Sequence, residues 1–240
     1  LTDKQKSVVN TLTDAVSASV KDICYFTGVT SAVISTLERK GIVEVSDTAV
    51  YRTPETLISD NSAKSKIILT EQQTDAKNNL FDKYKNGGGV SLLYGVTGSG
   101  KTSVFLSLID EVIKDGRQVI VMVPEIALTP QTINVFYSYF GDIVALFHSG
   151  LSAGERIDEW KRVKNGEAKI AIGTRSAVFA PFQNLGLIVM DEEHEHTYKS
   201  EMTPRYHARD IAKFRCVQND AFLLLSSATP SIESYKNAID

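Results

Sequence analysis

The chain has 240 residues, 42% of them hydrophobic, and a formal net charge of −3 at pH 7. This length allows one large domain, or a medium domain with a small one. The charge balance does not fit a strongly basic nucleic-acid binder, although local basic patches are compatible with it. No signal peptide opens the sequence, and no apolar run approaches the roughly 20 residues that span a bilayer. Cys24 and Cys216 have no neighbouring cysteine, so we expect a cytoplasmic protein without a disulfide or zinc framework.

Residues 1–53 are predicted to form a small winged-helix domain. Three short helical patterns come first, over residues 2–12, 17–27 and 30–41. The last of these is in the recognition-helix position. A segment that alternates apolar and polar residues follows over 42–52 and is typical of a β-hairpin. The domain has six basic and six acidic side chains, so it has no surplus positive charge to bind phosphates. A structural or protein-binding role is therefore at least as well supported as DNA binding.

Residues 54–66 are polar and lack periodicity, which indicates a linker. Residues 67–240 then alternate apolar strands with helical patterns. The predicted strands are residues 90–94, 118–124, 143–147, 168–174, 185–191 and 221–227, with helices such as 101–114 and 153–164 between them. Strands so apolar are buried on both faces, which predicts an α/β domain whose parallel sheet has helices on both sides. Ligands of such sheets bind at the carboxyl ends of the strands.

The sequence GVTGSGKT follows the first predicted strand and opens a helix. It matches the phosphate-binding pattern G-x-x-x-x-G-K-[ST], in which backbone N–H groups and a helix N-terminus surround an anion. In this pattern Lys101 reaches the β- and γ-phosphates of ATP, and Thr102 binds Mg²⁺. A plain glycine-rich turn is the alternative. The residues of the predicted ATP site are Gly95, Val96, Thr97, Gly98, Ser99, Gly100, Lys101 and Thr102.

The sequence DEEH ends the fifth predicted strand. Asp191 is predicted to hold Mg²⁺ opposite Thr102, and Glu192 to orient and deprotonate the attacking water, so we expect Lys101, Asp191 and Glu192 to be the catalytic residues. The alternative is a solvated acidic turn. His194 and His196 lack the spacing of a zinc site, and no cysteine lies near them.

One further strand end and one loop have residues suited to nucleic acid. Hydroxyls and a guanidinium at Thr174 and Arg175 suit phosphate oxygens. A loop with interleaved aromatic and basic side chains suits single strands, although its aromatics could instead pack on the core. Its residues are Tyr198, Arg205, Tyr206, His207 and Arg209. After the last strand, Thr229 has the sequence of a helix N-cap with Pro230 at the first helical position, as Thr129 has before Pro130.

These motifs together resemble those of superfamily 2 DNA helicases, most closely the bacterial replication-restart helicases. The resemblance is carried over residues 67–240 by GVTGSGKT, VPEIALTPQ, HSGLS, GTRSAVFAPF, VMDEEH, PRYHARD and SSATPS. It implies a RecA-like first lobe of an ATP-dependent 3′→5′ DNA helicase that acts at stalled forks in primosome assembly. It also implies that Ser227 and Thr229 couple hydrolysis to DNA movement, and that residues 195–209 sense single-stranded DNA. Gln72 is the better match for a glutamine that reads adenine, with Gln73 the alternative.

The resemblance implies partners and parts beyond this chain. ATP and Mg²⁺ are the expected cofactors. Single-stranded and forked DNA, a single-stranded-DNA-binding protein and primosome loading proteins are the expected partners, and no membrane is expected. We expect the chain to be a fragment that hydrolyses ATP poorly, with the second lobe and the zinc-binding insertion outside it. Pro204 stands where some relatives have tryptophan, and the segment EEHEHTYKS is less typical of the family. Another DNA translocase of the superfamily and a winged-helix transcription regulator with a P-loop switch remain alternatives.

Overall fold

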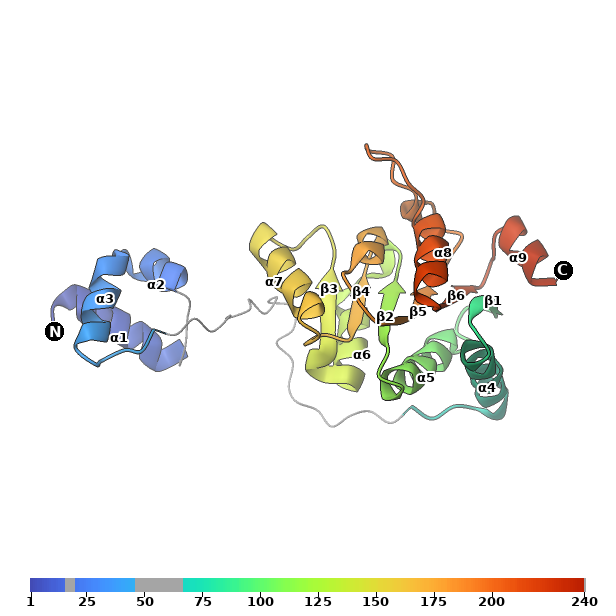
Figure 1. Cartoon of the computed structure of the whole chain (residues 1–240), viewed down its shortest axis with the longest axis horizontal. Helices are drawn as coiled ribbons and strands as arrows, with labels where there is room; N and C mark the ends of the chain where they lie inside the picture. The colour runs from blue at the N-terminus through green and yellow to red at the C-terminus, as the bar shows by residue number, and fades with distance from the viewer. Residues whose placement is uncertain (16–19, 46–66, 240) are drawn as a thin grey trace. The chain divides into compact units, whose positions relative to one another are not determined.

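A computed structural model describes residues 1–15, 20–45 and 67–239 of the chain (Figure 1). The chain divides into two compact units, Leu1–Arg52 and Thr53–Asp240. The apolar core of the first unit and the two core clusters of the second have no residue in common. None of the helices in the described ranges has the length and apolar character needed to cross a membrane.

The first unit contains the three predicted helices, α1 (Asp3–Ala15), α2 (Val20–Thr27) and α3 (Ser31–Arg39). They enclose a small core made by Val8, Ile23, Val29, Ile34 and Leu37. The predicted hairpin lies largely, and the predicted linker wholly, on residues 46–66, outside the described residues. The winged helix and the boundaries of the domains therefore stay predictions.

The second unit is built on a six-stranded sheet in which every pair of neighbours is parallel, in the order β1-β6-β5-β2-β4-β3. The strands are β1 (Gly89–Tyr94), β2 (Gln118–Met122), β3 (Val144–Phe147), β4 (Ile170–Gly173), β5 (Leu185–Met190) and β6 (Phe222–Ser227). Every residue of β5 and β6 is buried. The parallel sheet predicted from the apolar runs is therefore confirmed.

Helices cover both faces of this sheet (Figure 1). They are α4 (Glu71–Lys85), α5 (Lys101–Lys114), α6 (Pro130–Phe140), α7 (Ala153–Lys164), α8 (Ala208–Asn219) and α9 (Ile232–Ile239). Side chains alternate between the faces along each strand. In β2, Val119 and Val121 pack in the cluster with α4, α5 and α6, whereas Ile120 and Met122 pack in the cluster with α7 and α8.

Helix starts match the sequence at one of the two Thr-Pro sites. At the start of α6, the Oγ1 of Thr129 accepts a hydrogen bond from the N–H of Thr132, and Pro130 is the first helical residue. The same interpretation is wrong at Thr229, because α9 begins only at Ile232 and the Oγ of Ser231 accepts from the N–H of Ser234. Residues 228–231, between β6 and α9, are therefore not helical and instead bond to the DEEH residues, as described below.

Candidate active site

The conformation of the loop between β1 and α5 depends on glycine at three positions. Gly98 and Gly100 have φ of 79° and 81°, in the left-handed region that other residues avoid. Gly100 is also the N-cap of α5, so the first N–H groups of that helix face the loop. A Cβ at Gly95 would lie 2.9 Å from the Oγ of Ser99, which is closer than real Cβ contacts. The loop therefore has the tight turn and the exposed N–H groups that a phosphate site needs.

Lys101 lies at the start of α5 with its ammonium turned back over this loop. Its Nζ donates to the carbonyl oxygens of Gly95 at 2.7 Å and Val96 at 3.3 Å. Its charge opposes the rise in the pKa of Asp191 that burial causes. The next residue, Thr102, is exposed in the first turn of the helix. The predicted phosphate-binding and metal-binding side chains of the loop are thus neighbours at the start of α5.

Of the two candidate glutamines, Gln73 contacts the loop. Its Nε2 donates to the carbonyl oxygen of Ser99 at 2.9 Å. Its Oε1 accepts from the N–H of Thr70 at 2.9 Å, and the N–H of Gln73 donates to the Oγ1 of Thr70, which completes a capping box at the start of α4. Gln72, the better match by sequence, is exposed one residue earlier on the same helix.

Asp191 follows β5 directly and is held by the neighbouring strands. Its N–H donates to the carbonyl oxygen of Met122, and its Oδ1 accepts from the Oγ of Ser226 at 2.8 Å. Burial raises the pKa of the Asp191 carboxyl above its ordinary value, and the bond from Ser226 and the charge of Lys101 only partly oppose the rise. A carboxylate so poorly solvated gains from a cation beside it, and its oxygens with the hydroxyl of Thr102 are the hard donors that Mg²⁺ prefers. These residues therefore fit the expected metal.

Glu192 has a strained backbone and a side chain directed at the end of β6. Its φ is 43°, in the left-handed region. Its Oε2 lies 3.4 Å from both the Oγ of Ser227 and the N–H of Ala228. About a third of its side chain is exposed, which leaves the carboxylate access to water. Glu192 therefore lies at the strand ends with its carboxylate accessible, and its role in orienting water stays a prediction.

His194 joins the ends of β5 and β6. Its Nδ1 lies 2.8 Å from the Oγ of Ser227, and its Nε2 lies 3.3 Å from the Oγ1 of Thr229. The N–H of Thr229 also donates to the Oγ of Ser227 at 3.0 Å. The DEEH and SAT sequences, 33 or more residues apart, therefore form one hydrogen-bonded network. Sequence reasoning predicted both motifs but not that His194 is the link between them.

The loop from Glu195 to His207 is anchored more firmly than its sequence indicated. The ring of Tyr198 is fully buried, and its hydroxyl donates to the carbonyl oxygens of Met122 at 3.1 Å and Asp191 at 2.6 Å. The prediction that Tyr198 contacts DNA is wrong for this structure, because a buried ring offers no face to a base. The hydroxyl instead fixes the backbone at the end of β5.

Other residues of this loop also have internal partners. The Nδ1 of His207 accepts from the N–H of Arg209 and caps α8. The guanidinium of Arg209 binds the buried carboxylate of Glu193 at 2.9 Å. Tyr206 is half-buried, with its ring edge-to-face against Phe179 at 5.1 Å between centroids. His207 and Arg209 therefore make internal hydrogen bonds that the sequence did not predict, and Arg205 is exposed; the DNA contacts of these three residues stay predictions.

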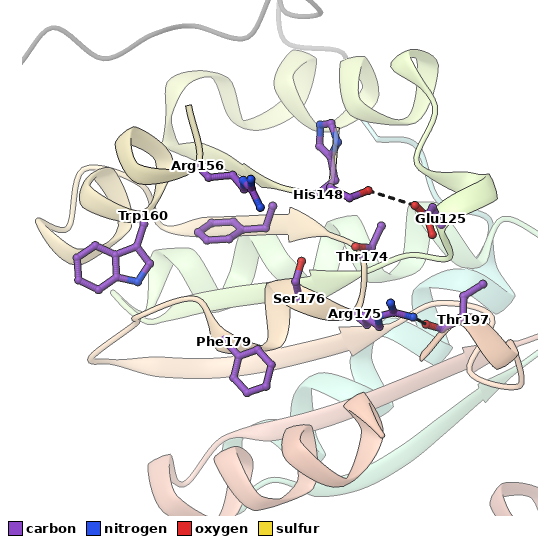
Figure 2. Close-up of a pocket in the computed structure, with 11 residues that line it drawn as sticks. Glu125, His148, Arg156, Trp160, Thr174, Arg175, Ser176, Phe179 and Thr197 are labelled. Atoms are coloured by element: carbon purple, nitrogen blue, oxygen red, sulfur yellow. Dashed lines mark hydrogen bonds between the residues drawn. The ribbon is translucent and has the colours of Figure 1, made fainter. Parts of the chain in front are cut away.

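A cavity of about 460 Å³ opens at the carboxyl ends of β3 and β4 (Figure 2). Figure 2 shows Trp160 toward one end of it and Glu125 with Thr197 toward the other. The lining residues are Glu125, Phe147, His148, Ser149, Arg156, Trp160, Thr174, Arg175, Ser176, Phe179 and Thr197. Glu125 accepts a hydrogen bond from the Oγ of Ser149 at 3.2 Å.

Thr174 and Arg175 lie on the wall of this cavity, as expected of strand-end residues. The Nη1 of Arg175 donates to the carbonyl oxygens of Thr197 and Lys199, both at 3.2 Å, so it also braces the loop after DEEH. Sequence reasoning missed the contributions of Arg156 and Trp160. The signal for them was weak, because both lie within a helix rather than at a strand end.

Comparisons with known proteins agree with this geometry. Residues 69–238 match the DEAD/DEAH box helicase family. The replication restart protein PriA of Bacillus subtilis (strain 168) is 42% identical over 98% of this chain, and that of Haemophilus influenzae is 41% identical over 86%. The chain spans only about 30% of the length of these relatives. In structure, RecG bound to a three-way DNA junction matches 71% of this chain and 23% of RecG, with a TM-score of 0.50 and 26% identity. Because the family match spans the sheet, the P-loop and DEEH, the chain belongs to the DEAD/DEAH box helicase family.

Proposed function

We propose that the chain is the nucleotide-binding lobe of an ATP-dependent DNA helicase that acts at stalled replication forks in replication restart. The observation that carries the proposal is the hydrogen-bonded network of Glu192, His194, Ser227 and Thr229, which links DEEH to the SAT sequence. A nucleotide switch without DNA movement would need the P-loop and an acidic residue, but not this link to the SAT sequence. The similarity to replication restart proteins over 98% of the chain supports the biological role.

In this proposal the chain's residues divide the work on ATP. The loop 95–100 and the N-terminus of α5 hold the phosphates, and Lys101 exchanges its carbonyl partners for phosphate oxygens. Thr102 and Asp191 hold Mg²⁺, which neutralises phosphate charge when it is bound. Glu192 orients the attacking water and accepts its proton. Gln73 is the favoured adenine reader over Gln72, because its amide already reaches the P-loop.

The DNA contacts are proposed for the exposed part of the same edge. Thr174 and Arg175 line the cavity at the ends of β3 and β4, and Arg205 is exposed in the loop after DEEH. Hydroxyls and guanidinium groups in this arrangement suit the phosphates of a single strand. Ser227 and Thr229 act on hydrolysis through His194 and Glu192 rather than by touching DNA, since Ser227 is fully buried.

The finer parts of the function come from the resemblance alone. They are 3′→5′ polarity, forked DNA as substrate, and partners that include a single-stranded-DNA-binding protein and primosome loading proteins. A cytoplasmic location agrees with the free thiols of Cys24 and Cys216. Zinc is proposed only for parts of the full-length protein that lie outside this chain.

The proposal is tested with the full-length protein by measuring ATP hydrolysis alone, with single-stranded DNA and with a forked duplex. We expect stimulation by both DNAs and unwinding of a partial duplex with a 3′ single-stranded arm. ATP hydrolysis that ignores DNA would favour the P-loop switch and refute the helicase. A second candidate is another DNA translocase of the superfamily, such as one that reverses forks, and the likeness to RecG bound to a three-way DNA junction agrees with binding of branched DNA. That candidate predicts regression of a model fork without unwinding of the partial duplex.

A further inference from the structure

The carboxylate of Glu193 is completely buried at the centre of a polar cluster. Its Oε1 accepts from the N–H of Ser231 at 2.6 Å. Its Oε2 accepts from the Oγ of Ser234 and the Nη1 of Arg209, both at 2.9 Å, and from the Oγ of Ser231 at 3.3 Å. We call Glu193, Arg209, Ser231 and Ser234 the Glu193 cluster. A buried carboxylate is tolerated only with such partners, because its desolvation is otherwise costly.

Arg209 supplies the positive charge of the Glu193 cluster. It is the second residue of α8, and about a fifth of its side chain is exposed. Its Nη1 also lies within hydrogen-bond distance of Ser234 and Ser231, at 3.0 and 3.3 Å. One guanidinium nitrogen thus bridges the start of α8, the DEEH turn and the start of α9.

Two of these three segments adjoin a residue of the proposed mechanism, and the third closes the loop that follows DEEH. Glu193 follows Glu192, whose φ of 43° requires support from its surroundings. Arg209 comes two residues after His207, where the loop from Glu195 closes through the antiparallel bridge of Lys199 with His207. Ser231 comes two residues after Thr229 of the SAT sequence. The ion pair joins the start of α8 to the DEEH turn, and hydrogen bonds join both to the start of α9. A shift of one segment therefore changes the positions of the other two.

We propose that Arg209 is a positioning residue for Glu192: by its ion pair with Glu193 it holds the backbone of Glu192 in the left-handed conformation that directs its carboxylate to the end of β6. The proposal rests on the proposed function only for the identity of the reaction, ATP hydrolysis. It assigns no direct contact with DNA to Arg209. The competing explanation is that the ion pair contributes to stability and to nothing else.

The test uses the full-length protein with Arg209→Gln, Glu193→Gln and the double variant Glu193→Gln/Arg209→Gln. Each single variant leaves a buried group without its charged partner and should lower the Tm. The double variant has two neutral amides that can hydrogen-bond, so its Tm should recover. We expect kcat for ATP, with and without DNA, to fall about tenfold to a hundredfold in all three, with the KM for ATP within about threefold of wild type.

Arg215→Gln is the matched control. Arg215 lies on the same helix, and its Nη1 donates only to main-chain carbonyls, those of Val178 and Ala180. Its loss should lower the Tm without a change in kcat of the folded protein. Arg209→Lys, which keeps the charge, should recover part of kcat.

The outcomes separate the explanations. A double variant whose kcat returns with its Tm would overturn the positioning role and leave a structural ion pair. A folded Arg209→Gln protein with wild-type kcat would overturn it as well. A wild-type protein that hydrolyses ATP without DNA stimulation would refute the proposed helicase, while its basal kcat would still decide the role of Arg209.

Discussion

At Glu192 the backbone adopts a conformation that costs a non-glycine residue roughly 1–3 kcal/mol. Asp220 is the other non-glycine residue with positive φ in the described ranges, and it caps the C-terminus of α8, where such a conformation is common. Glu192 has no such local reason. It is held by the bonds of its neighbours Asp191 and Glu193 on either side. The strain is therefore best explained by the need to direct this carboxylate at Ser227.

Lys101→Ala should abolish ATP hydrolysis in the full-length protein and weaken nucleotide binding about tenfold to a hundredfold, as expected for a charge-assisted hydrogen bond. The fold should persist, because the side chain is half-exposed and bonds only to loop carbonyls. Turnover and melting temperature are measured side by side. Lys114→Ala, at the other end of α5 in a surface ion pair with Asp110, is the control and should be active. Wild-type turnover by Lys101→Ala would contradict the P-loop assignment.

Glu192→Gln should bind nucleotide within about threefold of wild type and hydrolyse it about 10²–10⁴ times more slowly, because the amide cannot accept a proton from water. Single-turnover hydrolysis and the binding of a fluorescent nucleotide separate the two effects. Glu201→Gln, in the exposed part of the following loop, is the control and should hydrolyse normally. If Glu192→Gln lost nucleotide binding while it stayed folded, Glu192 would belong to the metal site and the roles assigned to Asp191 and Glu192 would be wrong.

Single residues were predictable where the backbone motif determines the position. Asp191 follows a strand directly, and Lys101 opens the helix that the glycine-rich loop leads into, so both positions are set by a local motif. A loop's sequence, by contrast, does not say which of its side chains turn inward, as Tyr198 and Arg209 do here. Their burial depends on the carbonyls of Met122 and Asp191 and on the carboxylate of Glu193, which only the folded sheet brings near.

At the scale of elements, the loop from Glu195 to His207 distinguishes a DNA motor from a nucleotide switch. Arg205→Ala should leave the melting temperature unchanged, since the side chain is exposed, and should weaken stimulation of ATP hydrolysis by single-stranded DNA. Tyr206→Ala should lower the melting temperature, since its ring packs on Phe179 and the core. ATP hydrolysis with and without DNA is measured beside the melting temperature.

Lys213→Ala removes the same charge from an exposed position on α8 and is the control for Arg205→Ala. If DNA stimulates the Arg205 variant as strongly as the wild type, then Arg205 does not contact DNA. If Tyr206→Ala is destabilised yet fully stimulated by DNA, then Tyr206 is a core residue only. Loss of stimulation without destabilisation would instead restore Tyr206 to the DNA contacts.

Helix α8 also makes a prediction about thiol chemistry. Cys216 faces the sheet, and burial raises the pKa of its thiol to about 12. Its thiolate fraction at pH 8 is then on the order of 10⁻⁴, whereas an ordinary thiol has about a quarter. A thiol reagent should therefore label only the half-buried Cys24 in the native chain, and both cysteines after unfolding. Cys24→Ser should abolish native labelling. Rapid native labelling of Cys216 would contradict the packing of α8.

Helices and strands could be predicted where the sequence pattern of a few neighbouring residues determines them. The six apolar runs predicted the six strands of the sheet in the described part of the chain, because runs of about four to eight apolar residues between turn signals are typical of strands. Burial on both faces holds for β5 and β6 but not for β1, where Val90 and Tyr94 are exposed.

Thr129 and Thr229 show the limit of local signals. Both precede proline, yet only Thr129 begins a helix, because Ser231 and the Glu193 carboxylate cap α9 two residues later. The order of the strands in the sheet could likewise not be predicted from the apolar runs, because it depends on which face of the sheet each connecting helix crosses.

At the scale of the whole molecule, the chain has two hydrophobic cores that share no residue. The core of the first unit uses residues between Val8 and Val43, and those of the second use residues between Ile67 and Leu225. Stability that depends on buried apolar surface is therefore divided between the units as well. The sequence indicated this division through the polar stretch 54–66.

Residues 67–240 should consequently fold and bind nucleotide without residues 1–66. We expect the melting temperature of the larger unit to change by less than about 2–4 °C, the shift that 1 kcal/mol produces in a domain of this size. Scanning calorimetry of the 240-residue chain and of residues 67–240, with and without a nucleotide analogue, makes the measurement. Nucleotide should raise the larger unit's melting temperature equally in both, because every residue assigned to the phosphate site lies after Ile67. If residues 67–240 alone lose more stability than this, or if nucleotide raises the melting temperature only in the 240-residue chain, then the larger unit needs the first unit in order to fold or to bind nucleotide.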